Sequence, residues 1–252
     1  MGIGESCYGA ISPAFVAEHF PAERRGRVLA LFSMAIPAGS ALGYIAGGAL
    51  GQAYGWRNAF YLVGLPGLVL MLLSLRLQEP DRSADAWSLS QPQGSALSSY
   101  RDLFRIPSFA YVTLAGAAMT FTLGGFAVWL PSFFHRQWGM SIGEAGTLFG
   151  AITVVAGVLG SLSGGWLADW ALNRTSRAYF LVSGLGFVAG LPLAAAALAL
   201  QDRTASLATL FLAEFCLFLN MGPINAVIVS VTSPRARSMA FAANILVIHA
   251  LG

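Results

Sequence analysis

Two carboxylates lie in stretches of this sequence that are otherwise uncharged. Glu5 is the only charged residue of 1–17, and Glu214 is the only charged residue of 204–234. Inside a bilayer, an ionised carboxylate is so costly that it must face a partner or a wet cavity, or stay protonated. A carboxyl group that exchanges protons with water can couple proton flow to helix movement. Glu5 and Glu214 are therefore candidates for proton coupling, and the alternative is a structural carboxyl group bonded to a neighbouring helix.

Polar side chains of the kind that line an amphiphilic cavity accompany these carboxylates. Asn220 and Asn225 flank Pro223, which frees backbone carbonyls inside a helix bundle. The remaining candidates for substrate binding are Tyr8, Ser12 and His249. The alternative is that these groups make ordinary interhelical hydrogen bonds.

The composition of the chain indicates a membrane protein. Of the 252 residues, 56% are hydrophobic and only 10% are charged, whereas an ordinary soluble domain has about a quarter charged residues. The net charge of +3 comes from arginines grouped in twos and threes between apolar runs. This spacing is typical of loops between membrane spans, so we expect a lipid bilayer as surroundings and no nucleic-acid partner.

The gaps between charges have the length of membrane-spanning helices, which need about 20 mostly apolar residues. Six stretches are long enough, and a shorter one lies at each end of the chain, so the sequence predicts an all-α membrane protein truncated at both ends. The six full spans are expected at 28–56, 58–75, 106–134, 145–168, 178–201 and 204–234, and the partial ones at 1–17 and 238–252.

The arginines predict how these spans are oriented. With alternating loops, eleven arginines fall on one side of the membrane, and only Arg57, Arg136 and Arg203 fall on the other. Short cytoplasmic loops are enriched in arginine. We therefore expect a multi-pass protein of the bacterial inner membrane, with the arginine-rich loops in the cytoplasm.

A polar segment divides the chain into two halves. Residues 78–108 are rich in Ser, Pro and Gln and are expected to form a central cytoplasmic linker. Its end, 97–104, fits either a short amphipathic helix on the membrane surface or a solvated loop. The expected organisation is the end of an N-terminal bundle of three spans at 1–77, the linker at 78–108, and a C-terminal bundle of four spans plus a truncated fifth at 109–252.

The two halves resemble each other weakly. Each contains a span with one carboxylate, a proline further along and an arginine cluster at its cytoplasmic end, as expected for two pseudo-repeat halves that rock about a central site. In the first half a glycine stripe, Gly39, Gly43 and Gly47, occupies one helix face and predicts close helix packing.

No enzyme class is favoured by the sequence. The two cysteines lie in separate apolar stretches, so we expect neither a metal site nor a cofactor. The nearest nucleophile candidate, Ser163, lacks the spacing of a hydrolase motif and a partner base. No phosphate-binding motif is present that would drive ATP-dependent pumping.

Several motifs resemble those of the major facilitator superfamily. The stretch 39–48 resembles the glycine motif of that family's fifth helix, and Gly165 to Asp169 resembles its cytoplasmic loop motif after the eighth helix. Glu5 with its neighbours, the stretch 35–47 and Pro107 with its neighbours resemble the spinster-like branch. The resemblance implies helices four to ten, and most of the eleventh, of a twelve-helix transporter.

The resemblance also implies site roles. Glu5 would be the proton-linked carboxylate, and Tyr8, Asn220, Asn225 and His249 would line the central cavity. Gating contacts at the cytoplasmic side would involve Arg24, Arg25, Arg27 and Asp169.

The expected function is secondary transport of an amphiphilic or lipid-like small molecule by alternating access, coupled to protons, in a monomer. The alternatives are efflux of drugs or organic anions by a transporter of the same superfamily, a non-transporting receptor, and an inactive truncated fragment. Substrate identity and transport direction are left open by the sequence.

Overall fold

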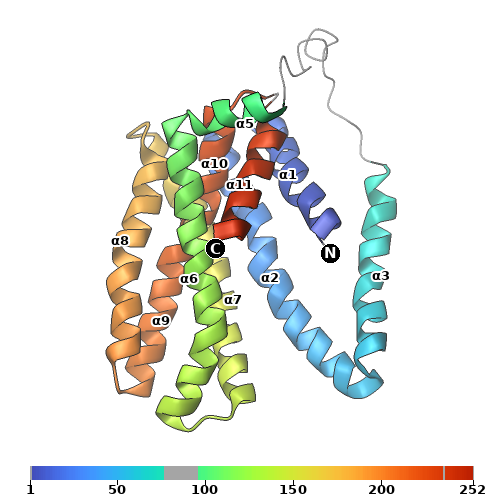
Figure 1. Cartoon of the computed structure of the whole chain (residues 1–252), viewed down its shortest axis with the longest axis vertical. Helices are drawn as coiled ribbons and strands as arrows, with labels where there is room; N and C mark the ends of the chain where they lie inside the picture. The colour runs from blue at the N-terminus through green and yellow to red at the C-terminus, as the bar shows by residue number, and fades with distance from the viewer. Residues whose placement is uncertain (1, 77–95, 235, 252) are drawn as a thin grey trace. The chain divides into compact units, whose positions relative to one another are not determined.

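The computed structural model consists of helices throughout the part of the chain that it describes. It describes residues 2–76, 96–234 and 236–251, without the side chains of 2–8, 22, 40–49, 51, 52, 56, 96–99, 142 and 143. The ten helices are α1 (Gly2–His19), α2 (Ala22–Tyr54), α3 (Trp56–Ser74), α5 (Ala96–Phe104), α6 (Pro107–Trp138), α7 (Ile142–Leu172), α8 (Ala178–Ala199), α9 (Arg203–Phe218), α10 (Met221–Val231) and α11 (Arg237–Leu251). The predicted all-α fold is confirmed (Figure 1).

Five helical segments within the described residues are long and apolar enough to cross a membrane. They are Arg57–Ser74, Pro107–Trp138, Glu144–Leu172, Ala178–Ala199 and Arg203–Val231. Each coincides with a predicted span. The sixth predicted full span, 28–56, lies almost entirely in α2, a helix of 33 residues in which the side chains of 40–49 lie outside the described set.

The chain divides into two compact units. Unit 1 comprises Met1–Met34 and Pro92–Gly252, and unit 2 comprises Ala35–Gln91. Helix α2 begins in unit 1 and ends in unit 2. The domain boundaries predicted from the sequence, at 77 and 108, remain a prediction.

Close helix contacts hold α7, α8 and α9 of unit 1 together. Helix α9 packs against both α7 and α8. A Cβ atom on Gly160 of α7 would lie 2.6 Å from the carbonyl oxygen of Phe215, and one on Gly186 of α8 would lie 2.6 Å from the carbonyl oxygen of Cys216. Only glycine lets these backbones approach so closely, as in small-residue packing of membrane helices generally.

A second packing region joins α6, α10, α11 and α1. Its core contains large buried side chains from several helices, including Phe109, Ile228 and Phe241, each at most 1% exposed. Helix α10 continues the course of α9 after a break at Leu219 and Asn220. Pro223 explains the break, because it lacks a backbone N–H and its ring displaces the carbonyl of Leu219 four residues earlier.

Helix α5 forms from the end of the predicted linker, and so the helical alternative for 97–104 is the observed one. It lies against the ends of α6 and α11 (Figure 1). Leu103 is buried at 4% exposure, while Arg101 and Asp102 are exposed. The helix is thus amphipathic, as its sequence requires for an interfacial position. Helix α6 begins at Pro107, two residues before the predicted start of the C-terminal bundle.

Unit 2 contains the rest of α2 and the apolar helix α3. The turn between them is made at Gly55, whose φ of 80° is accessible to glycine at little cost. Nearly all of the described α3 side chains are exposed, including Phe60, Leu68 and Leu72. Around Gly39, no atom of the described residues lies within 4 Å of the position that a Cβ would occupy. The surroundings of Gly43 and Gly47 lie outside the described set, so the predicted packing role of this stripe stays a prediction.

Candidate functional site

A buried carboxylate joins three helices at the end of unit 1 near α5. Asp169 lies near the end of α7 and is 8% exposed. One of its oxygens, Oδ2, accepts a hydrogen bond from the backbone N–H of Arg27 on α2 at 2.8 Å. The other, Oδ1, accepts one from the Tyr179 hydroxyl on α8 at 3.2 Å. The carboxylate therefore faces the first turns of α2, where the helix dipole is positive.

Glycines make this junction possible. A Cβ on Gly26 would overlap the Asp169 carboxylate, and one on Gly165 would lie 2.5 Å from the Cβ of Ala30 and 2.7 Å from the Gly26 carbonyl. A Cβ on Gly222 of α10 would lie 2.9 Å from the Cβ of Ala30 and 3.0 Å from the Gly26 carbonyl oxygen. Helices α2, α7 and α10 thus converge on a point where side chains would not fit. We call Asp169, Arg27 and Tyr179, with these three glycines, the Asp169 junction.

The arginines predicted to act in gating surround this junction in different ways. Arg27 contributes its backbone N–H to Asp169, and its side chain is exposed. Arg25 donates through Nε to the carbonyls of Ala17 and Phe20, both at 3.1 Å, and so braces the turn between α1 and α2. Arg24 is exposed. Of the four predicted gating residues, the structure brings Asp169 and Arg27 into direct contact.

Glu214 occupies a separate position in the interface between α7 and α9. It is fully buried, with 0% exposure. Its Oε1 accepts a hydrogen bond from the Thr153 hydroxyl at 3.2 Å, and its Oε2 has no partner within the described part of the chain. No arginine pairs with Glu214 in the described part of the chain. The Thr153 hydroxyl therefore supplies the one hydrogen bond that compensates for removing this carboxyl group from water.

The predicted cavity residues are dispersed over several helices. Asn225 donates to the Ser33 hydroxyl of α2 at 2.8 Å, and Asn220 is 1% exposed and approaches the Met119 sulfur at 3.9 Å. Ser12 is half-buried and His249 is exposed. The side chains of Glu5 and Tyr8 lie outside the described residues. Among the described residues, no hydrogen bond connects Glu214 to either asparagine.

The partners of these groups were not predicted from the sequence. Tyr179, Thr153 and Ser33 are polar residues in apolar stretches, and that signal alone could have marked them as candidates. Their pairing could not be predicted, because each contacts a residue on another helix. Asn244 of α11 is 5% exposed, and its side-chain oxygen has no partner among the described atoms.

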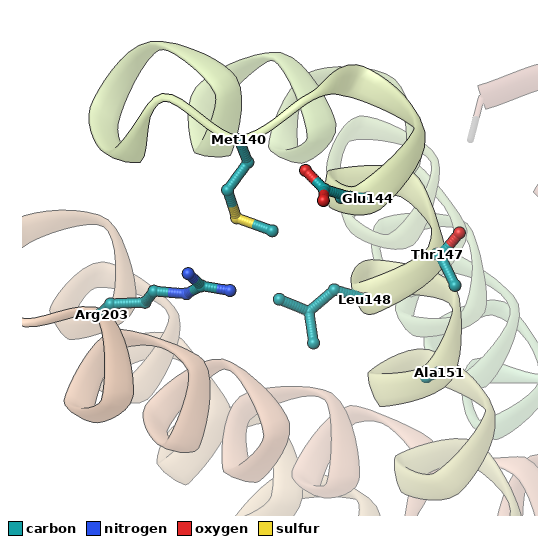
Figure 2. A pocket seen from close by; sticks show the side chains of 6 residues that line it. All are labelled: Met140, Glu144, Thr147, Leu148, Ala151 and Arg203. Atoms are coloured by element: carbon teal, nitrogen blue, oxygen red, sulfur yellow. The ribbon is translucent and has the colours of Figure 1, made fainter.

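A pocket lies at the end of unit 1 away from α5, where α7 and α9 begin. Its volume is about 660 Å3. Figure 2 shows its lining, which is Met140, Glu144, Thr147, Leu148, Ala151 and Arg203. None of these residues was predicted to bind a ligand. No group of acidic, histidine and cysteine side chains suited to a metal ion occurs in the described ranges.

Taken together, the apolar helices, the buried carboxylates and the glycine-mediated contacts define a multi-pass helical membrane protein. The model of the Major Facilitator Superfamily matches residues 1–252. The chain belongs to this family.

Spinster proteins are among the curated proteins to which this chain is similar. The chain is 31% identical to protein spinster of Drosophila melanogaster, over 100% of this chain and 43% of that protein. It is 34% identical to protein spinster homolog 1 of Mus musculus, over 100% of this chain and 51% of that protein. It is 30% identical to the probable sphingolipid transporter spinster homolog 2 of Arabidopsis thaliana, over 100% of this chain and 54% of that protein. The chain therefore spans about half the length of the curated relatives that it matches.

A solved structure supports the fold. The crystal structure of a bacterial homolog to the human lysosomal transporter Spinster, in an inward-facing and unoccupied conformation, superposes with a TM-score of 0.61 and 22% identity. The match covers 96% of this chain and 56% of that chain. The likeness shows that the two chains share a fold.

Proposed function

We propose that this chain forms part of a secondary transporter that moves an amphiphilic or lipid-like small molecule by alternating access. The proposal is supported by membership of the Major Facilitator Superfamily and by similarity to spinster proteins, one of which is named a probable sphingolipid transporter. Proton coupling by Glu5 and Glu214 is part of the proposal. The transporter acts as a monomer in the bacterial inner membrane, with the arginine-rich ends and α5 in the cytoplasm.

The observation that carries proton coupling is the environment of Glu214. A carboxyl group without an ion-pair partner is far more stable protonated than ionised inside a membrane. Glu214 is fully buried, and its Oε2 has no partner among the described atoms. Entry of water from one side would allow the proton to leave, and its return from the other side would complete a coupled cycle.

The Asp169 junction supports the alternating-access part of the proposal. It joins the start of α2 to α7 and α8 through two hydrogen bonds to one carboxylate. Net contributions of such bonds are about 1.5–3 kcal/mol when one partner is charged. A contact of this strength closes one side of the protein and still opens on the time scale of transport.

The test is uptake of a lysophospholipid panel by vesicles that contain the protein, with and without a proton gradient. Gradient-dependent uptake is expected for the wild type, and a loss of about tenfold or more is expected for Glu5→Gln and for Glu214→Gln. Glu23→Gln is the control, because Glu23 is an exposed carboxylate in the first turn of α2. Equal uptake by wild type and both variants, at equal expression, would make these carboxyl groups structural.

The substrate class is tested by the same vesicles. Uptake of organic anions or drugs, with no uptake of any lysophospholipid, would overturn the lipid-like substrate. It would favour the efflux alternative within the same superfamily.

A further inference from the structure

The pocket between α7 and α9 combines an apolar floor with one cationic wall. Met140 and Leu148 belong to, or pack against, a buried cluster that includes Leu130, Phe134, Phe149 and Leu210. Arg203 extends from α9 toward Met140 and Leu148, and Glu144 lies on the α7 side (Figure 2). A ligand that fills this pocket must therefore have an apolar portion and a polar head near Arg203.

The Arg203 guanidinium is available to a ligand. Among the described residues, no hydrogen bond or ion pair within 4 Å engages it. The neighbouring Asp202 carboxylate is occupied as the N-cap of α9, where it accepts from the backbone N–H of Ala205 at 2.7 Å. Arg203 is also the first residue of α9, so the positive end of the helix dipole adds to its charge.

The Glu144 carboxylate is engaged on its own helix. Its Oε2 accepts hydrogen bonds from the Ser141 backbone N–H at 3.0 Å and from the Ser141 hydroxyl at 2.8 Å, in a capping box that begins α7. Because these bonds hold Glu144 at the helix start, Arg203 is not neutralised by a direct ion pair. The negative charge of Glu144 weakens the attraction of the pocket for an anion but does not cancel that of Arg203.

The walls of the pocket are held in place by bonds between separate chain turns. The His135 ring nitrogen Nδ1 and the Met140 carbonyl lie within hydrogen-bond distance at 2.6 Å, which fixes the turn from α6 to α7. The Trp138 indole N–H donates to the Gln201 carbonyl at 3.3 Å, which ties that turn to the turn before α9. The backbone positions of Arg203 and of the apolar floor are therefore set by the fold before any ligand binds.

We propose that this pocket binds a single-chain amphiphile with an anionic head, with Arg203 on the head and Leu148, Met140 and Ala151 along the chain. The site lies near the start of α7, whereas the Asp169 junction lies near the end of that helix. This inference rests on the proposed transport of amphiphiles and adds an entry or exit site with a preferred sign of charge.

The experiment is photo-cross-linking of the full chain in nanodiscs with decyl phosphate that carries a diazirine next to its head. Mass spectrometry locates the cross-linked peptide. Labelling of the peptide that contains 144–151 is expected, and Arg203→Gln is expected to reduce it about tenfold or more, as for loss of a charge-assisted hydrogen bond. Labelling that is unchanged in Arg203→Gln would overturn the proposal.

Matched variants separate charge from shape. Arg136→Gln removes an exposed arginine in the last turn of α6 that does not line the pocket. Labelling of this variant is expected to equal that of the wild type. Ala151→Trp fills the apolar part and is expected to block labelling with Arg203 intact. Glu144→Gln retains the capping box and is expected to increase labelling. Normal labelling in Ala151→Trp would overturn the proposed position of the chain.

Two further probes define the ligand class. Decyltrimethylammonium with the same diazirine is expected not to label the peptide, and inorganic phosphate at equal concentration is expected not to compete. Labelling by the cation or competition by phosphate would overturn the anionic amphiphile. The measurement is made at equilibrium without a proton gradient, so the outcome for the Glu5 and Glu214 variants in transport does not affect it.

Discussion

The Asp169 carboxylate accepts a hydrogen bond at 2.8 Å from the backbone N–H of Arg27, a residue 142 positions earlier in the chain. The bond ties the first turns of α2 to the end of α7. A backbone donor is insensitive to the identity of the side chain at that position, so the contact depends on Asp169 and on the course of α2. Substitutions at position 27 therefore leave this bond in place, whereas substitutions at 169 remove it.

Loss of the Asp169 carboxylate is expected to destabilise unit 1. Asp169→Ala removes the acceptor for both Arg27 and Tyr179, and the expected cost is about 1.5–3 kcal/mol in the free energy of unfolding. Tyr179→Phe removes one of the two bonds and is expected to cost about 0.5–1.5 kcal/mol. Denaturation in detergent measures both, and the double variant tests coupling. If the losses of unfolding free energy in Asp169→Ala and Tyr179→Phe simply add in the double variant, the two side chains do not share a hydrogen bond that contributes to stability.

The glycine contacts at the same junction predict intolerance to one added methyl group. Gly165→Ala would place a Cβ 2.5 Å from the Cβ of Ala30, and the expected loss of stability is about 1–3 kcal/mol. Gly184→Ala is the control, because no neighbouring atom of the described residues lies within 4 Å of its Cβ position. The control is expected to be neutral or slightly stabilising, since alanine favours helix. Equal melting temperatures for the two variants would argue against close packing at Gly165.

The hydrogen bond between Asn225 and Ser33 predicts a measurable link between α10 and α2. The two side chains meet at 2.8 Å. Interhelical hydrogen bonds in membrane proteins have averaged about 0.6 kcal/mol in double-mutant cycles. A double-mutant cycle of Asn225→Ala, Ser33→Ala and the double variant is expected to give a coupling energy of about 0.6 kcal/mol. A coupling energy of zero would contradict this link.

Thr153 is predicted to position the Glu214 carboxyl group. Thr153→Val removes the hydroxyl that donates to Oε1 and keeps the volume of the side chain, whereas Thr153→Ser keeps the hydroxyl. Gradient-driven uptake is expected to fall several-fold in the valine variant and to be largely retained in the serine variant. A similar loss in both would assign the effect to packing of the threonine methyl group instead.

Membrane spans were predictable from the sequence because a bilayer imposes one simple requirement. Gaps between charges must reach about 20 residues, and so the ends of α3, α6, α7 and α8 fall within a few residues of the predicted ones. The interruption of 204–234 into α9 and α10 was not predicted, although Pro223 was noted. Proline signals that a break is tolerated, but packing against α6 and α7 decides whether and where the helix bends.

The candidate sites were predictable only in part. A carboxylate in an apolar stretch is costly anywhere in a bilayer, and so Glu214 could be singled out from its neighbours in sequence. Its partner Thr153 lies on another helix, 61 positions away, and no local spacing identifies it. Arg203 was counted only for orientation, because its position over an apolar floor depends on two separate turns held together by Trp138 and Gln201.

The break between α9 and α10 divides one membrane span into two pieces with different neighbours. Helix α9 packs chiefly on α8 and α7, whereas α10 packs on α6, α7 and α8 and also contacts α11 and α1. Because Pro223 has already interrupted the backbone hydrogen-bond ladder, a change of angle at Asn220 would sacrifice little further bonding. This span therefore has a joint at its middle, with Glu214 on the half that packs on α7 and α8 and Asn225 on the half that is hydrogen-bonded to Ser33 of α2.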